Sequence, residues 1–302
     1  MIGQWQEAND PGFIAGVQVG AFKGAVKNLS NSDYHLLDKY YSSSQLKYIH
    51  ATSGEHFKAK YIDKKLESKE QTKQMLLGSL VHCMVITPGM FEKEFALMPD
   101  LNLRTNEGKA TKEKFLMENP GKSIINDEML KDAQCMRSAI DENEKAKDLL
   151  AFCLNEVSLF WTCPYSNLNF KARVDAMSAK HFVELKTARS ASPEIFPGSA
   201  HNLDYDLSLA HYHEGIKQVL SVDATAYFVA VENELPYVVQ CYKASEAMMT
   251  LGHTKWLGAV DKLSAGFKYQ KWSGYFGELD EIPEISPPAW AMRNMGDIDG
   301  IP

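Results

Sequence analysis

Cysteine is scarce in the sequence, and its spacing suggests neither a disulfide framework nor a zinc site. The 302 residues contain five cysteines, at positions 83, 135, 153, 163 and 241, and no two of them stand in a Cys-x-x-Cys pattern. An odd number without paired spacing argues against disulfides and cysteine-ligated zinc. We therefore expect buried or half-buried thiols, a reducing environment and a cytoplasmic location.

Long apolar runs are also missing. The longest, Leu80–Ile86, is interrupted by His82, whereas a membrane helix needs about 18 apolar residues. Residues 1–10 do not combine a basic segment with an apolar one, as a signal peptide would. The sequence therefore predicts no membrane association.

An excess of basic residues is absent as well. The formal net charge is −7, which argues against a generic nucleic-acid coat protein because such proteins are usually basic. It does not exclude an enzyme that gathers lysines in one groove and carboxylates around a metal, since overall charge does not report on active-site chemistry. Hydrophobic residues make up 45% and charged residues 24%, as in ordinary globular domains.

The pattern changes along the chain from helical to strand-rich. We expect a loosely ordered lead-in over 1–30 and one domain over 31–302, with a helical part (31–150), a catalytic sheet part (151–270) and a tail (271–302). The predicted fold is α/β, with a mixed central sheet flanked by helices and a helical N-terminal elaboration. Apolar periodicity and capping residues predict helices at 45–49, 75–86, 126–150, 205–220 and 244–267. Alternating β-type residues predict strands at 156–162, 169–177, 181–187, 224–231 and 237–242.

Two of these strands carry acidic residues at a spacing that suggests chemistry. Side chains alternate along a strand, so Glu184 and Lys186 share a face. If the neighbouring strand pairs with this one, Asp175 lies near Glu184. Two carboxylates and the Leu185 carbonyl make a site suited to Mg²⁺, for which Mn²⁺ should substitute. With metal bound there, Lys186 could polarise the attacking water or stabilise a phosphate, as phosphodiester hydrolysis requires.

This short pattern has other readings. Asp-x8-Glu-x-Lys is common by chance, and a strand with Glu and Lys two residues apart is usually a solvated face, although the apolar Val183 and Leu185 suggest an interior segment. Asp175 and Glu184 could also be the acid and base of a glycosidase. A DNA-binding protein without catalysis is a third alternative. His82, within an apolar helix, is either a hydrogen-bonded core histidine or a metal ligand. Glu156 is either an exposed carboxylate at a strand end or a second ligand.

At these residues the sequence resembles the PD-(D/E)XK nucleases, and specifically the C-terminal nuclease domain of RecE-type exonuclease (exonuclease eight). The resemblance spans roughly residues 30 to 293 and does not depend on one motif. The segments that carry it are Ser44-Gln45-Leu46, Leu77-Gly78-Ser79-Leu80-Val81-His82-Cys83 with Thr87-Pro88, Arg104-Thr105-Asn106-Glu107-Gly108-Lys109, Glu156-Val157-Ser158-Leu159-Phe160-Trp161, Arg173-Val174-Asp175, Glu184-Leu185-Lys186-Thr187 and Ser286-Pro287-Pro288-Ala289-Trp290-Ala291.

The resemblance implies a site and an activity. His82, Glu156, Asp175 and Glu184 would surround the metal ions, and Lys186 would be the catalytic lysine. The activity would be 5′-to-3′ digestion of double-stranded DNA ends to leave a 3′ single strand for recombination. A ring-shaped homo-oligomer and a RecT-type single-strand annealing protein would be its partners. An endonuclease or a single-strand-specific nuclease of the same fold is the alternative.

DNA contacts are expected from two further regions. Arg104 and Lys109 lie in a basic segment where Gly108 would allow close backbone approach, although a solvated loop is an equal alternative. Arg173, Ser208 and Tyr212 complete the expected DNA-binding set. The family often has Gln-x-x-x-Tyr on the helix after the lysine strand, and here Ser208 stands at the Gln position. Either His211 or Gln218 could compensate for it.

Overall fold

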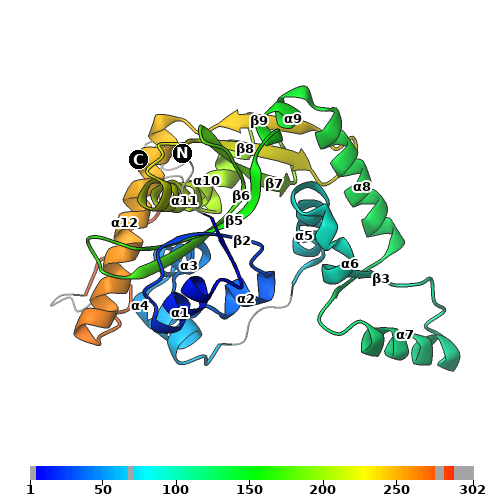
Figure 1. The fold of residues 1–302 in the computed structure, drawn as a ribbon, viewed down its shortest axis with the longest axis horizontal. Coiled ribbons are helices and arrows are strands. Elements are labelled where there is room, and N and C mark those ends of the chain that lie inside the picture. The colour runs from blue at the N-terminus through cyan, green and yellow to red at the C-terminus, as the bar shows by residue number, and fades with distance from the viewer. Residues whose placement is uncertain (1–4, 67–70, 276–281, 289–302) are drawn as a thin grey trace, which may run out of the picture.

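A seven-stranded mixed sheet runs through the centre of the protein (Figure 1). The computed structural model describes residues 5–66, 71–275 and 282–288. The strand order is β1-β2-β5-β6-β7-β8-β9; β1·β2 and β7·β8 are parallel and the other pairs antiparallel. The strands are β1 (Gln6–Glu7), β2 (Gly24–Lys27), β5 (Leu154–Thr162), β6 (Asn169–Met177), β7 (His181–Ala188), β8 (Thr225–Glu232) and β9 (Val239–Lys243). A separate parallel pair consists of β3 (Phe95–Leu97) and β4 (Ser123–Ile125).

One face of the sheet is covered by helices from both ends of the chain. Trp256 of α12 and Leu207 of α11 are fully buried there, against Leu159 and Phe170 of the sheet. Ser42 caps α3 in a capping box with Gln45, as the serine run predicts. The helices on this face are α3 (Ser43–Ala51), α4 (Gly54–Phe57), α10 (Phe196–Asn202), α11 (Tyr205–Leu220) and α12 (Glu246–Tyr269), and the π-helical turn η1 (Lys58–Ile62) follows α4.

The opposite face packs against α5 and α8. The stripe predicted from Met129, Ala133, Met136 and Ile140 is buried against Val183, Leu185 and the neighbouring strand β8. The predicted helix 126–150 is divided at Asn143, whose side chain caps a second helix. The helices on this side are α5 (Lys73–Ile86), α6 (Phe91–Glu94), α7 (Asn106–Glu118), α8 (Asp127–Glu142) and α9 (Glu144–Leu150), with a short 3₁₀ turn η2 (Pro88–Met90).

Hydropathy identifies one pair of helices here that resembles a membrane span. Within the described ranges, no single helix is long and apolar enough to cross a bilayer. The bent pair Lys73–Ile86 and Pro88–Glu94, at 119° to each other, passes by length and composition alone. Leu80 and Val81 of this pair are fully buried in the protein core.

Residues 5–30 correct the expectation of a loosely ordered lead-in. They form helix α1 (Pro11–Val19) and strand β2, which pairs with β5 in the central sheet. The ring centres of Phe13 and Phe22 lie 5.0 Å apart, and both rings pack against Phe160 of β5. The elements are too short for a periodic pattern, and contacts with β5 stabilise them. The tail segment Ser286–Ala291 is described only to residue 288, so most of that prediction lies outside the described residues.

Helices α11 and α12 approach so closely that one glycine is required between them. A Cβ at Gly252 would lie 2.1 Å from the carbonyl oxygen of Asp206, whereas a Cβ at Gly258 of the same helix would meet nothing within 4 Å. We expect Gly252→Ala to lower the free energy of unfolding by about 1–3 kcal/mol, because backbone must shift. Gly258→Ala should instead raise it by about 0.5–1 kcal/mol through helix propensity.

Urea unfolding of both variants, followed by circular dichroism, measures these changes. Equal effects of the two substitutions would contradict the close approach of α11 to α12.

Candidate metal centre and active site

The centre of the site is the point where β6 and β7 separate. These strands pair only through Ala176↔Val183 and Met177↔Phe182. The next positions in the same register are Asp175 and Glu184, which are not paired. Asp175 Oδ2 instead accepts a hydrogen bond from the Leu185 backbone N–H at 2.8 Å. The side chain therefore takes the place of a backbone partner, and the two acidic residues lie at the head of the fork.

The neighbouring pair of strands is distorted at the same level. The ladder between β5 and β6 runs from Asn155↔Ala176 to Val157↔Val174 and omits the residues between them. Glu156 has a φ of 52°, a left-handed conformation that costs a non-glycine residue about 1–3 kcal/mol. Val174 packs toward α11 whereas Ala176 packs toward α5, although residues two apart in a regular strand share a face. This irregularity sets the position of both Glu156 and Asp175.

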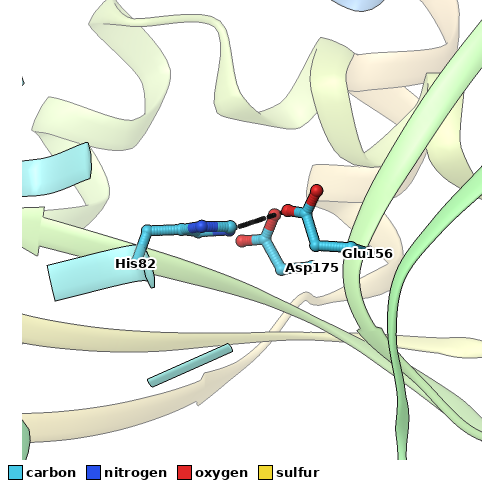
Figure 2. Close-up of side chains that lie close together, drawn as sticks. All are labelled: His82, Glu156 and Asp175. Atoms are coloured by element: carbon cyan, nitrogen blue, oxygen red, sulfur yellow. Dashed lines mark ion pairs between the residues drawn. The ribbon is translucent and has the colours of Figure 1, made fainter. Parts of the chain in front are cut away.

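His82 reaches these carboxylates from α5. Its Nε2 lies 3.1 Å from Asp175 Oδ1 and 3.4 Å from Glu156 Oε1. The ligand atoms of the three residues all lie within 4.8 Å of one another, and Figure 2 shows the imidazole directed at both carboxylates. One turn earlier, Gly78 lets α5 lie close to β7, since a Cβ there would be 3.0 Å from Thr187 Oγ1.

The charges in this cluster hold one another in place. Burial alone would lower the pKa of His82, but the charges of Asp175 and Glu156 outweigh it and raise that pKa to about 9. Burial raises the pKa of Glu156, against the opposing effect of His82 and Arg173. At Asp175, the His82 charge and hydrogen bond overcome burial and lower the pKa. Without a metal, the protonated His82 thus supplies the positive charge beside the carboxylates of Asp175 and Glu156.

Glu184 and Lys186 form a second, adjoining pair. Lys186 donates a hydrogen bond to Glu184 Oε1, while Glu184 Oε2 is buried without a hydrogen-bond partner. Burial raises the pKa of Glu184 despite the neighbouring ammonium group. Burial would lower the pKa of Lys186, but the charges of Glu184 and Asp175 raise it instead. Lys186 Nζ also lies 4.9 Å from the centre of the Tyr205 ring, so Lys186 remains a cation.

The donor set fits a divalent cation. An imidazole nitrogen and carboxylate oxygens from His82, Glu156 and Asp175 converge, and oxygen-rich sets of this kind suit Mg²⁺ and Mn²⁺. The buried Glu184 Oε2 lacks a partner, and a buried carboxylate oxygen normally has one. We expected the backbone carbonyl of Leu185 to be a metal ligand. The side chain of Leu185 is buried, and its backbone N–H donates to Asp175.

His82, Glu156, Arg173 and Lys186 line one cleft of about 450 Å³. A cleft with convergent titratable groups is where a substrate is expected to bind. The cleft is lined by Asn31, His35, Gly78, Ser79, His82, Thr87, Glu94, Glu156, Arg173, Leu185, Lys186, Thr187 and Tyr205.

Arg173 supports the metal ligands and has few donors left for DNA. Its Nη1 lies 3.2 Å from Glu156 Oε2, and Nε donates to Ser158 Oγ at 3.1 Å. Nη2 donates to the carbonyl oxygens of Leu29 and Ser30 at 3.0 and 3.3 Å. The guanidinium also lies 4.3 Å from the Tyr34 ring centre. The side chain is 10% exposed, so its role is to hold Glu156, which the sequence did not indicate.

Lys171 is a second internal cation on β6. Its Nζ donates to the carbonyl oxygens of Tyr34 and Leu37 at 2.7 and 2.8 Å, and its side chain is buried. Burial, together with the charge of Arg173, lowers the pKa of Lys171 to about 8. Lys171 and Arg173 thus attach residues 29–37 to the strand that carries Asp175.

The predicted basic segment lies elsewhere. Figure 1 shows α7 at the edge of the molecule beyond β3, and Arg104 and Lys109 are exposed there. The structure does not bring these residues to the metal cluster. Gly108 serves an internal contact, since a Cβ there would lie 2.2 Å from the Asn102 carbonyl oxygen. This internal contact explains why position 108 is a glycine. We had expected the glycine to allow DNA to approach the backbone.

Ser208 and Tyr212 lie on α11 and are not among the residues that line the cleft. Ser208 is buried, and its hydroxyl donates to the Asp204 carbonyl at 3.4 Å. Burial raises the pKa of Tyr212, whose hydroxyl is hydrogen-bonded to Ser43. Neither candidate for compensating Ser208 reaches the site: His211 is bonded to Lys171 O and Trp256, and Gln218 donates to Glu214.

The fold and the cluster define a class, the PD-(D/E)XK nucleases, in which carboxylates and a lysine meet where sheet strands separate. A family model described as "PDDEXK-like domain of unknown function (DUF3799)" matches residues 42–284. The chain belongs to this family. This agrees with the predicted superfamily and with the mixed α/β fold, without distinguishing a RecE-type member.

Comparison with solved structures supports the same fold. The chain is similar to a protein from Eubacterium rectale named "Putative exonuclease", with 14% sequence identity and a TM-score of 0.58. The similarity covers 91% of this chain and 99% of that one. No curated protein matches the sequence.

The raised pKa of His82 makes the stability of the metal-free protein depend on pH. The imidazole has a pKa of about 9 when folded and about 6.5 when unfolded. The protonated imidazole therefore contributes fully to the free energy of unfolding below pH 6.5, and this contribution is lost as the pH rises through 9. We expect the difference in unfolding free energy between wild type and His82→Gln to shrink over this range. Urea unfolding in chelator at pH 6 and pH 9.5 measures it; a difference independent of pH would contradict the pairing with Asp175.

Arg173 should affect metal affinity through Glu156. We expect Arg173→Gln to weaken Mn²⁺ binding about 10- to 100-fold, because outer-shell partners orient metal ligands. Isothermal titration calorimetry measures the affinity. Arg137→Gln is the matched control, since the exposed Arg137 pairs with the exposed Asp141 at 3.4 Å on α8. Equal affinities for the two variants would remove the positioning role.

Proposed function

We propose that the protein is a Mg²⁺-dependent exodeoxyribonuclease that digests linear double-stranded DNA. The observation that carries the proposal is the cluster of His82, Glu156 and Asp175 beside the buried Glu184 and its partner Lys186, at a cleft that His82, Glu156 and Lys186 line. Phosphodiester hydrolysis requires activation of water and stabilisation of negative charge on the phosphate, which a divalent-ion site beside a fixed ammonium group can provide.

The residues have separate roles in this proposal. His82, Glu156 and Asp175 would hold the ion, and Glu184 Oε2 is a further oxygen available to it. A bound divalent ion supplies charge for a phosphate oxygen and lowers the pKa of water. Lys186 has a raised pKa and stays protonated, so it acts as a hydrogen-bond donor that stabilises the phosphate in the transition state. Because its ammonium group is already protonated, it cannot accept a proton from water.

Support for exonucleolytic action comes from two sources. The Eubacterium rectale protein of similar fold carries an exonuclease name, and the sequence motifs resemble RecE-type exonuclease. On this basis we propose 5′-to-3′ polarity, 3′ single-stranded products for recombination, a ring-shaped homo-oligomer and a RecT-type annealing partner. The exposed Arg104 and Lys109 on the α7 side would contact the duplex away from the metal cluster.

Digestion of an end-labelled linear duplex tests the proposal. With Mg²⁺, we expect the wild type to release label from the 5′ end, to spare covalently closed circular DNA, and to be inactive in chelator. Lys186→Ala should reduce the rate about 10²- to 10³-fold, because it removes a preorganised transition-state contact, while the circular dichroism spectrum and duplex binding are retained.

Each other result has a defined meaning. Cleavage of the closed circle identifies an endonuclease, and digestion of single strands alone identifies a single-strand-specific enzyme. Binding without any metal-dependent nucleotide release leaves a DNA-binding protein. Full activity of Lys186→Ala would reject the assigned catalytic group.

A further inference from the structure

A second lysine lies beside Lys186 and comes from a different layer of the protein. Lys47 is on α3, and its Nζ lies 5.6 Å from the centre of the Tyr205 ring, over which Lys186 Nζ also lies at 4.9 Å. Tyr205 lines the catalytic cleft. Lys47 is not itself among the residues that line the cleft, but its ammonium group lies next to Tyr205, which does line it.

Lys47 differs from the neighbouring lysines Lys186 and Lys255 in the group that it binds. Its Nζ donates a long, weak hydrogen bond of 3.4 Å to the carbonyl oxygen of Leu203. The nearby Asp204 and Asp206 are bound by Lys255 at 2.7 and 3.0 Å. Glu184 is bound by Lys186. Within the part of the chain that the structure describes, no carboxylate forms an ion pair with Lys47.

A half-buried cation beside another cation needs an anion. Burial, and after it the charge of Lys186, lowers the pKa of Lys47 against the opposing charges of Glu184, Asp204 and Asp206. With a divalent ion bound and His82 neutral, the ion, Lys47, Lys186 and Arg173 carry five positive charges, whereas Glu94, Glu156, Asp175 and Glu184 carry four negative charges. A DNA phosphate next to Lys47 supplies the negative charge that this region lacks.

We propose that Lys47 binds the DNA phosphate next to the scissile one, on the strand being cut. The inference rests on the proposed function and deepens it. Lys186 serves the reacting phosphate, and Lys47 fixes the register of the strand at the Tyr205 end of the cleft. Two ammonium groups over one aromatic ring are then brought together by consecutive phosphates, each forming charge-assisted hydrogen bonds.

The salt dependence of duplex binding tests this contact. Binding of a fluorescent duplex is measured by anisotropy over a salt series with Ca²⁺ in place of Mg²⁺, and gels verify that the duplex stays intact. Losing one phosphate contact should reduce the slope of log affinity against log salt by about 0.9. We expect this for Lys47→Gln, with about 5- to 10-fold weaker binding at low salt, and a retained slope for Lys47→Arg.

Lys268→Gln is the matched control, because Lys268 is exposed on α12 and its Nζ lies 5.1 Å from the Tyr269 ring. Its slope should equal that of the wild type. In turnover, Lys47→Gln should raise KM more than it lowers kcat, since the contact holds the strand before and during reaction.

The outcomes separate the two proposals. If the wild type cleaves DNA but Lys47→Gln keeps the wild-type salt slope, Lys47 makes no phosphate contact and only this inference falls, whatever the rate. If the wild type cleaves nothing with any divalent metal, the proposed function falls. A reduced slope for Lys268→Gln equal to that of Lys47→Gln would also overturn the assignment, because the effect would not be local.

Discussion

The site depends on the separation of strands β6 and β7, which stop pairing just before Asp175 and Glu184. After Ala176↔Val183, β6 and β7 stop pairing, and the Asp175 carboxylate accepts a hydrogen bond from the backbone N–H of Leu185. A continued ladder would leave no space between the strands for a substrate group. Because the fork opens between both helical layers, α5 can contribute His82 from one side while Tyr205 of α11 lines the cleft from the other.

Each carboxylate in the fork is held by nitrogen donors of neighbouring residues. Asp175 has a backbone N–H and the imidazole, Glu156 has the Arg173 guanidinium, and Glu184 has the Lys186 ammonium. Three negative groups can therefore stay close together without a metal, since each would otherwise carry a large desolvation cost. The arrangement fixes the oxygens before an ion binds, so little reorganisation is required.

Local patterns accounted for much of the fold and for the acidic strands. Apolar spacing predicted the buried stripe of α8, and alternation predicted β6 and β7, so the proximity of Asp175 to Glu184 followed from strand geometry. The remainder depends on contacts between distant segments. The left-handed Glu156, the internal use of Arg173 and the position of β2 arise from packing that no single window of sequence contains.

Lys171 and Arg173 make residues 29–37 part of the active-site framework. The carbonyl oxygens of Leu29, Ser30, Tyr34 and Leu37 accept from these two cations, yet the family match begins only at residue 42. A fragment trimmed to that boundary would leave both cations short of acceptors inside the protein, and unpaired buried charges are strongly destabilising. The minimal functional unit of this chain therefore extends upstream of its recognisable family segment.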